Sequence, residues 1–193
     1  MFPSHASSLL LFPLRLWRSK GHGIHSPFAF SLITDTLTPG YRYYAYDDIE
    51  RLNQPESRRR LMKLVVRLLA RFAPSTVRLC GHDEALASLV ALQCPSALIV
   101  TDPADCRQCD FTIVTDPSQW RPGAVSAAGS GVTDARGFDS PEVILLADSS
   151  GAPARELWRQ LLSCGSYMTF EGWRSALAVR REGLPPQSFK LIF

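Results

Sequence analysis

Two pairs of side chains in this sequence have a spacing that metal or redox chemistry uses. His22 and His25 lie three residues apart in the stretch SKGHGIHSPFAF, and Cys106 and Cys109 form a C-x-x-C pair. Imidazole and thiolate groups bind zinc, but a structural zinc site needs four ligands. Each pair therefore supplies half of such a site, and the C-x-x-C spacing also fits a redox dithiol.

The histidine pair also has a structural interpretation. The glycines beside it permit a sharp turn, and Ser26 and Pro27 suit the cap and the first position of a following helix. A histidine there could act as a base or hold the turn by a hydrogen bond to the backbone. Because two histidines are too few for a metal site, we predict that His22 and His25 form a joint that docks the N-terminal helices and bind no metal.

The cysteine pair would need further ligands to hold zinc. Cys94 is a candidate third ligand and Cys80 or His82 a candidate fourth, but the sequence has no second C-x-x-C pair. Free thiols are the simpler interpretation of the five cysteines, because buried cysteine behaves as a small apolar residue and disulfides are rare in the cytoplasm. We therefore predict no metal site, with zinc and redox roles as the alternatives.

Three aspartates form a third group. Asp102, Asp116 and Asp148 each end a short apolar run, in SALIVTD, DFTIVTD and EVILLAD. Such continuous runs are typical of parallel strands that are buried on both faces, and ligands bind beyond the carboxyl ends of such strands. Aspartate is also a common turn residue. Three in series nevertheless favour a polar cleft along one edge of the sheet.

The elements that must position these residues follow from hydrophobic spacing. Residues 57–73 have an apolar face of helical period, and Pro74 ends that helix. Further helices are predicted at 83–94 and 152–164, strands at 76–81, 96–102, 110–116, 142–148 and 188–193, and a hairpin within 166–183. Helices that alternate with apolar strands predict an α/β fold after a helical N-terminal part.

Composition narrows the classes of function. The chain has 193 residues, 46% of them hydrophobic, and a net charge of +3. That charge is too small to favour nucleic acid, and a solvated helix face is the simpler interpretation of the basic run at 58–71. The apolar run LLLFPL is too short to span a membrane and has no cleavage site after it. We expect a cytoplasmic protein with no membrane partner.

Several of these stretches together resemble a known family. HGIHSPFAF, YYAYDDIE, the basic helix and the strand-glycine-helix unit, with the ending ALAVRREGLPPQSFKLIF, resemble bacterial class I S-adenosylmethionine-dependent methyltransferases. The resemblance implies a Rossmann-like, mostly parallel sheet with a C-terminal antiparallel hairpin at 74–193 and a helical N-terminal extension at 1–73. It implies methyl transfer from S-adenosylmethionine to a small molecule or another acceptor that the sequence does not identify.

The resemblance also implies roles for four residues. Gly81 would lie under the cofactor, and Asp102 would hold the ribose hydroxyls. Asp116 and Asp148 would be the catalytic residues that line the acceptor side. Whether the chain is a monomer or a homodimer is not implied.

The cofactor region departs from the family in two places. Leu79 stands where the family has an acid, and His82, Asp83 and Glu84 replace small residues. Asp83 and Glu84 suit the start of a helix, but we expect them to repel the carboxylate of S-adenosylmethionine. A helix and a strand are also missing after Asp102. Weak or lost cofactor binding is therefore predicted, and the alternative is a non-catalytic binding or scaffold protein that retains the fold.

Overall fold

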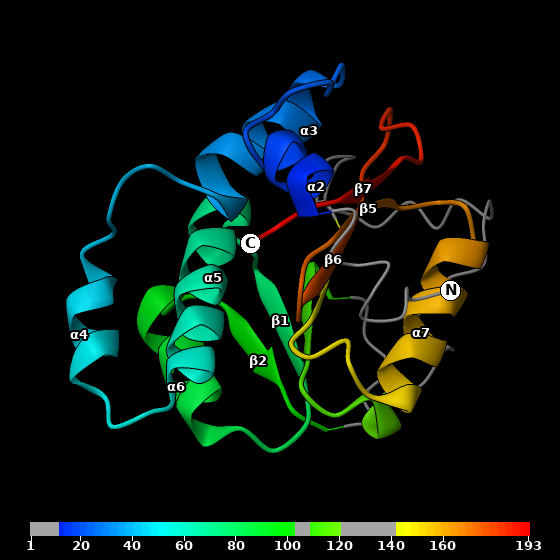
Figure 1. Ribbon diagram of the computed structural model, residues 1–193. Helices are drawn as coiled ribbons and strands as arrows, with labels where there is room; N and C mark the ends of the chain where they lie inside the picture. The colour runs from blue at the N-terminus through cyan, green and yellow to red at the C-terminus, as the bar shows by residue number, and fades with distance from the viewer. Residues whose placement is uncertain (1–11, 103–108, 121–141) are drawn as a thin grey trace.

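A single sheet forms the centre of the protein. The structure, a computed structural model, describes residues 12–102, 109–120 and 142–193. Seven strands in these ranges form one sheet in the order β2-β1-β3-β4-β6-β5-β7 (Figure 1). Their bounds are β1 Thr76–Cys80, β2 Leu98–Val100, β3 Phe111–Val114, β4 Glu142–Leu146, β5 Met168–Glu171, β6 Ala176–Arg180 and β7 Ser188–Lys190.

The strand directions confirm a mostly parallel sheet with an antiparallel hairpin. Strands β1 to β4 are mutually parallel, β6 is antiparallel to both of its neighbours, and β7 is parallel to β5. Strands β3 and β4 are buried along nearly all of their length because both faces of the sheet are covered there. The α/β character predicted from the sequence is therefore present.

Helices lie before the first strand and between later strands, and they cover both faces of the sheet. In the described ranges they are α2 Phe12–Ser19, α3 Pro27–Ser31, the π-helix η1 Leu32–Leu37, α4 Ala45–Arg51, α5 Glu56–Phe72, α6 Glu84–Gln93, the 3₁₀ turn η2 Pro117–Gln119 and α7 Ala152–Ser163. In Figure 1, α5 and α6 lie on one side of the sheet and α7 on the other. None of these helices is long and apolar enough to cross a bilayer.

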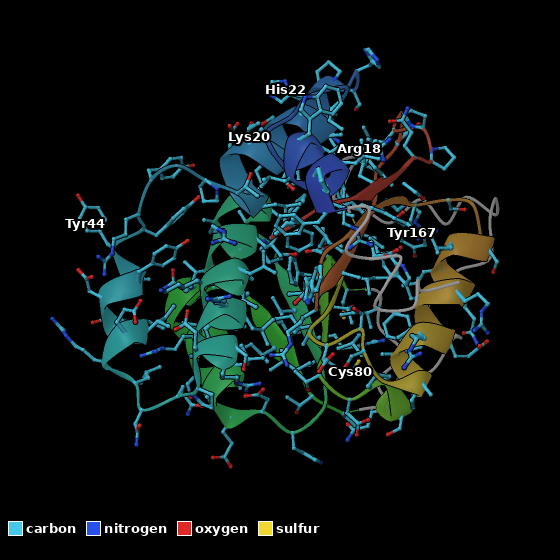
Figure 2. The ribbon with its side chains drawn as sticks, in the orientation of Figure 1. Arg18, Lys20, His22, Tyr44, Cys80 and Tyr167 are labelled. Atoms are coloured by element: carbon cyan, nitrogen blue, oxygen red, sulfur yellow. The ribbon has the colours of Figure 1, made fainter. Side chains whose placement is uncertain are left out.

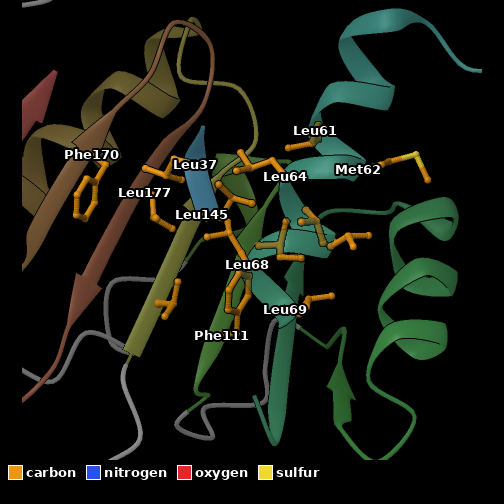
Figure 3. Packing of buried hydrophobic residues seen from close by; sticks show 14 of the residues in the cluster. Leu37, Leu61, Met62, Leu64, Leu68, Leu69, Phe111, Leu145, Phe170 and Leu177 are labelled. Carbon is orange, nitrogen blue, oxygen red and sulfur yellow. The ribbon is translucent and has the colours of Figure 1, made fainter. Parts of the chain in front are cut away.

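Helix α5 is the main packing element of the larger core. Its apolar face buries Leu64 and Leu68 against Phe111 and Leu145 of the sheet (Figure 3). Ala73 takes a left-handed conformation after the last turn, and Pro74 follows it, so the helix ends where the sequence predicts. Each fully buried leucine contributes about 1.5–3 kcal/mol to stability. The N-terminal helices share this core with the sheet.

The predicted turn before α3 is present in the structure. Gly21 and Gly23 have φ angles of 82° and 70°, which favour glycine. Ser26 Oγ accepts a hydrogen bond from the Ala29 N–H at 3.3 Å, and Pro27 occupies the first helical position. His22 stacks on Trp17, with ring centroids 5.3 Å apart. The two glycines and the Ser26 cap thus form the predicted joint. The contact that His22 makes there is an aromatic stack on Trp17.

Candidate functional site

The predicted site residues lie along one edge of the sheet. Because β1 to β4 are parallel, their carboxyl ends meet at this edge, where Cys80 pairs with Val114 and Val114 with Leu146. Asp102 follows β2, Gly81 follows β1, and the aspartates at 116 and 148 follow β3 and β4. The strand order changes direction between β1 and β3, and ligands of open α/β sheets bind at such a switch point.

Gly81 is held tightly against the loop after β3. Its φ of 125° is a conformation that other residues rarely adopt, and a Cβ there would overlap Thr115 Oγ1 and lie 3.0 Å from the Asp116 nitrogen. The Cys80 carbonyl accepts hydrogen bonds from the backbone N–H groups of Thr115 and Asp116, both at 2.9 Å. This contact within the protein explains the glycine without a cofactor.

Asp83 is engaged by the protein itself. Its carboxylate caps α6 by accepting a hydrogen bond from the Leu86 N–H at 3.0 Å, as its position predicts. It also forms an ion pair with Arg58 of α5, and its side chain is only 8% exposed. Arg58 offsets the charge of Asp83, which argues against the predicted repulsion of a ligand carboxylate at Asp83; that repulsion stays a prediction. Any such repulsion would come from Glu84, which is exposed.

Asp116 forms a turn immediately after β3. Its carboxylate accepts hydrogen bonds from the Ser118 hydroxyl at 2.6 Å, the Ser118 N–H at 2.9 Å and the Gln119 side chain at 3.3 Å. The bonds from Ser118 are the main reason that the pKa of Asp116 is lowered, and the nearby His82 acts in the same direction. A carboxylate with a lowered pKa is a weak general base at neutral pH.

Asp148 forms a similar turn after β4. Partial burial raises its pKa, but hydrogen bonds from Ser150 and the charge of Arg174 outweigh burial, so the pKa lies below its ordinary value. The bond from the Ser150 N–H is 2.8 Å long. Asp148 is therefore ionised at neutral pH and suits orienting a donor group of a ligand better than removing a proton.

Asp102 is an exposed carboxylate at this edge. It lies two residues beyond β2 and makes a contact within the protein. Residues 103–108, which include Cys106, lie outside the described residues, so the C-x-x-C pair cannot be placed. An exposed carboxylate at the end of β2 can accept hydrogen bonds from the hydroxyls of a ligand.

The described thiols are not arranged as metal ligands. Burial raises the pKa of Cys80 to about 11 and also raises that of Cys94. Cys109 is buried, whereas Cys164 is exposed. Within the described ranges, no group of three or more His, Cys, Asp or Glu side chains could hold a metal ion. The interpretation of Cys80 as an unreactive buried thiol agrees with this environment.

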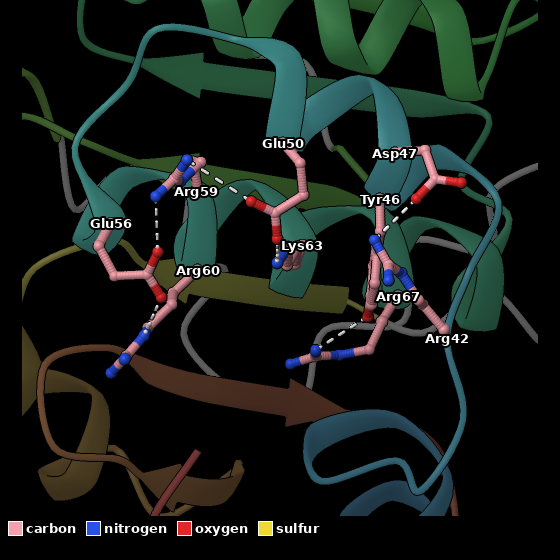
Figure 4. Close-up of polar contacts among 9 residues, drawn as sticks. All are labelled: Arg42, Tyr46, Asp47, Glu50, Glu56, Arg59, Arg60, Lys63 and Arg67. Atoms are coloured by element: carbon pink, nitrogen blue, oxygen red, sulfur yellow. Dashed lines mark hydrogen bonds and ion pairs between the residues drawn. The ribbon is translucent and has the colours of Figure 1, made fainter.

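The basic face of α5 is paired with acidic and polar groups. Arg59 and Lys63 form ion pairs with Glu50 of α4, the first at 3.5 Å (Figure 4). Arg67 donates to the hydroxyl of Tyr46 at 3.0 Å. The predicted solvated face is thus partly covered by α4. These pairings leave less positive charge available to bind phosphate than the sequence implies.

A pocket of about 280 Å³ lies on a different part of the sheet. It is lined by residues of α7, β5 and β7, among them Arg155, Arg159, Thr169, Glu171 and Lys190. No sequence pattern predicts this pocket, because its lining residues come from three separate segments and no local motif joins them. It is not formed by the predicted site residues.

Comparisons of the chain with protein-family models, with curated proteins and with solved structures found no match.

Proposed function

We propose that the sheet is a Rossmann-like sheet of the class I methyltransferase type without its third strand. The doubly wound fold orders its strands 3-2-1-4-5. The order β2-β1-β3-β4 agrees with 2-1-4-5 if β3 and β4 correspond to the fourth and fifth strands of that fold. Only residues 103–108 separate Asp102 from Cys109, too few for a helix and a strand. The hairpin of β5 and β6 fits the C-terminal hairpin of the family.

The function that we propose for this fold is that of a methyltransferase-like protein with a weakened S-adenosylmethionine site. One observation carries it: Asp102, Gly81 and Asp116 follow β2, β1 and β3, beside the switch point of the sheet. Asp102 would hold the ribose, and Gly81 would lie under the cofactor, which supplies the methyl group when bound. Asp116 and Asp148 would bind and orient the acceptor.

The described residues fit one end of this cofactor and not the other. The carboxylate of Asp102 is exposed, so it could accept hydrogen bonds from ribose hydroxyls in addition to its contact within the protein. At the methionine end, Thr115 fills the space beside Gly81, and the exposed Glu84 adds negative charge. Because Glu84 is exposed, solvent screens its repulsion of a ligand carboxylate, so the filled space beside Gly81 is the larger obstacle to binding. We therefore assign no transfer step to this site.

The second candidate is a non-catalytic binding or scaffold protein that retains the fold. It is favoured by the internal partners of the carboxylates at the sheet edge. Asp83 is paired with Arg58, and the side chains at 116 and 148 accept hydrogen bonds from residues two positions later. Carboxylates that stabilise turns can persist in a protein that binds no cofactor.

Titration calorimetry with S-adenosylmethionine and S-adenosylhomocysteine tests the proposal. For the weakened site we expect binding in the millimolar range, which corresponds to about −4 kcal/mol. Asp102→Ala should remove this binding. Asp47→Ala is the matched control, because Asp47 is an exposed aspartate of α4 whose side chain is 63% exposed.

The other outcomes separate the alternatives. No binding of either compound at any accessible concentration supports the scaffold candidate. Micromolar binding that Asp102→Ala abolishes would contradict a weakened site and would support a working methyltransferase. Micromolar binding that survives Asp102→Ala would place the cofactor elsewhere and reject the role proposed for Asp102.

A further inference from the structure

Helix α2 has its polar and apolar sides reversed. Arg15 and Ser19 are its buried residues, each 5% exposed, whereas Leu14 and Leu16 are 43% exposed and Trp17 is 51% exposed. A surface helix ordinarily turns its apolar side to the core. The side of α2 that faces away from the protein is thus the apolar one.

Polar contacts fix this orientation. The Arg15 guanidinium forms an ion pair with Glu171 of β5 at 3.2 Å, and both side chains are largely buried. Ser19 Oγ donates to the Arg15 carbonyl at 2.7 Å and accepts from the Ile192 N–H at 2.8 Å. Rolling the helix to bury its leucines would leave Glu171 without this partner, which is costly for a buried charge.

The exposed apolar side chains are accompanied by positive charge. Phe12 and Phe30 are 43% and 46% exposed and extend the apolar group. Arg18, Lys20 and His22 lie at the same end of the molecule (Figure 2). The first acidic residue of the whole sequence is Asp35. We name this surface the α2 patch, and it consists of Phe12, Leu14, Leu16, Trp17, Arg18, Lys20 and Phe30.

We propose that the α2 patch binds the surface of an anionic phospholipid bilayer. Leucine, phenylalanine and tryptophan side chains can enter the interfacial region of a bilayer, where tryptophan is enriched. Lys and Arg beside them are attracted to anionic headgroups. A helix that lies on a bilayer needs no spanning length, so this agrees with the lack of a spanning helix in the described ranges. It revises our expectation that the chain has no membrane partner.

Charge favours a lipid surface over a second copy of the chain. In a two-fold dimer the same patch occurs on both sides of the interface. The segment that forms α2 and its following turn carries Arg18 and Lys20 and has no acidic residue. A dimer through this patch would therefore place like charges together, whereas an anionic bilayer neutralises them.

Co-sedimentation of the full chain with vesicles tests the proposal. We use vesicles of phosphatidylcholine alone and vesicles with 30% phosphatidylglycerol, about the anionic content that gives a substantial surface potential. We expect binding to the anionic vesicles and at least tenfold weaker binding to the neutral ones. Each basic residue near an anionic surface contributes about fivefold, so Arg18→Glu/Lys20→Glu should weaken binding by more than tenfold.

A pair of aromatic variants isolates the apolar contribution. Trp17→Ser should weaken vesicle binding about tenfold. Tyr44→Ser should leave it unchanged, because Tyr44 is fully exposed but lies beside α4, away from Arg18, Lys20 and His22 (Figure 2). Circular dichroism of each variant verifies that it is folded. The charge variant replaces two residues at or near the surface and gives an independent test if Trp17→Ser fails to fold.

Three results would overturn the proposal. One is no binding to either vesicle by the folded wild-type chain. Another is equal binding by the two aromatic variants. The third is a dimer in analytical ultracentrifugation that Trp17→Ser dissociates, which would assign the patch to a second copy of the chain.

Discussion

The turn before α3 and the loop before α6 have the same design and different surroundings. Each has a glycine at positive φ, with Gly21 at 82° and Gly81 at 125°, and each leads to a helix capped by a side chain. At the turn, His22 stacks on Trp17 of α2, and both side chains remain exposed. In the loop, Asp83 is buried against an arginine.

The difference concerns which side chains are available to a ligand. A residue whose type suits binding can serve a partner only if the fold has not already given it a stronger internal contact. By this criterion the exposed residues of the turn are better candidates for an external partner than Asp83. The turn with the histidine pair is therefore the better candidate for a contact with an external partner. The loop before α6, which the family resemblance implied as the cofactor loop, is the weaker candidate.

The largest expected effect on stability comes from substituting the glycines of the two regions. Gly81→Ala should lower the free energy of unfolding by about 3 kcal/mol, because the methyl group overlaps Thr115 and the φ of 125° is strained. Gly21→Ala should cost about 1 kcal/mol, because the nearest atoms, 2.5 Å from the added Cβ, belong to the exposed and rotatable ring of Phe30. Equilibrium urea unfolding measures both.

The second substitution separates strain from overlap at Gly81. Thr115→Ala removes the overlapping oxygen, so it should recover part of the stability of Gly81→Ala and none of that of Gly21→Ala. If the two glycine variants lose the same free energy of unfolding, the loop at Gly81 is not packed more tightly than the turn at Gly21.

The ion pair of the loop should have the next largest effect. Arg58→Ala leaves the Asp83 carboxylate buried without its partner. The side chain of Arg58 is 27% exposed and therefore partly screened, so we expect a loss of about 2 kcal/mol. Arg42→Ala is the matched control and should change stability by less than about 0.5 kcal/mol, since its pair with Asp47 is exposed on both sides.

Thermal or urea unfolding at neutral pH gives both values. If the Arg58 and Arg42 variants lose the same stability, Asp83 is solvated rather than engaged, and the expected repulsion of a ligand carboxylate at this loop would return.

The smallest expected effect is a pH dependence at the end of β1. Burial raises the pKa of Cys80 from 9.0 to about 11, so folding disfavours its thiolate. The protonated thiol is the form that the folded state prefers. The stability associated with this preference is therefore fully present below pH 9 and is lost as the pH rises toward 11. At pH 9.5 we expect a loss of roughly 0.8 kcal/mol relative to pH 7.

Comparison of urea unfolding at the two pH values, for the wild type and Cys80→Ala, isolates this loss. The variant should lack it, although other groups that titrate in this range contribute equally to both proteins. The same loss in both proteins would show that Cys80 does not titrate late and that the end of β1 is more open than the structure implies.

The sequence by itself determined the elements and their caps. The period of the apolar residues around Leu64 and Leu68 predicts α5, and Ser26 with Pro27 predicts the start of α3. The apolar runs before the aspartates at 102, 116 and 148 predict three parallel strands. These features could be predicted because they depend on residues only a few positions apart, through helical period, capping and strand burial.

Only the tertiary structure decided which polar groups have partners. Arg58 meets Asp83 across 25 positions, and Arg15 meets Glu171 across 156. No local spacing encodes such pairs, because they form when separate elements pack together and the cost of burying a charge selects its partner. For the same reason the sequence could predict an apolar, basic segment near the N-terminus, but not that α2 buries its arginine and exposes its leucines.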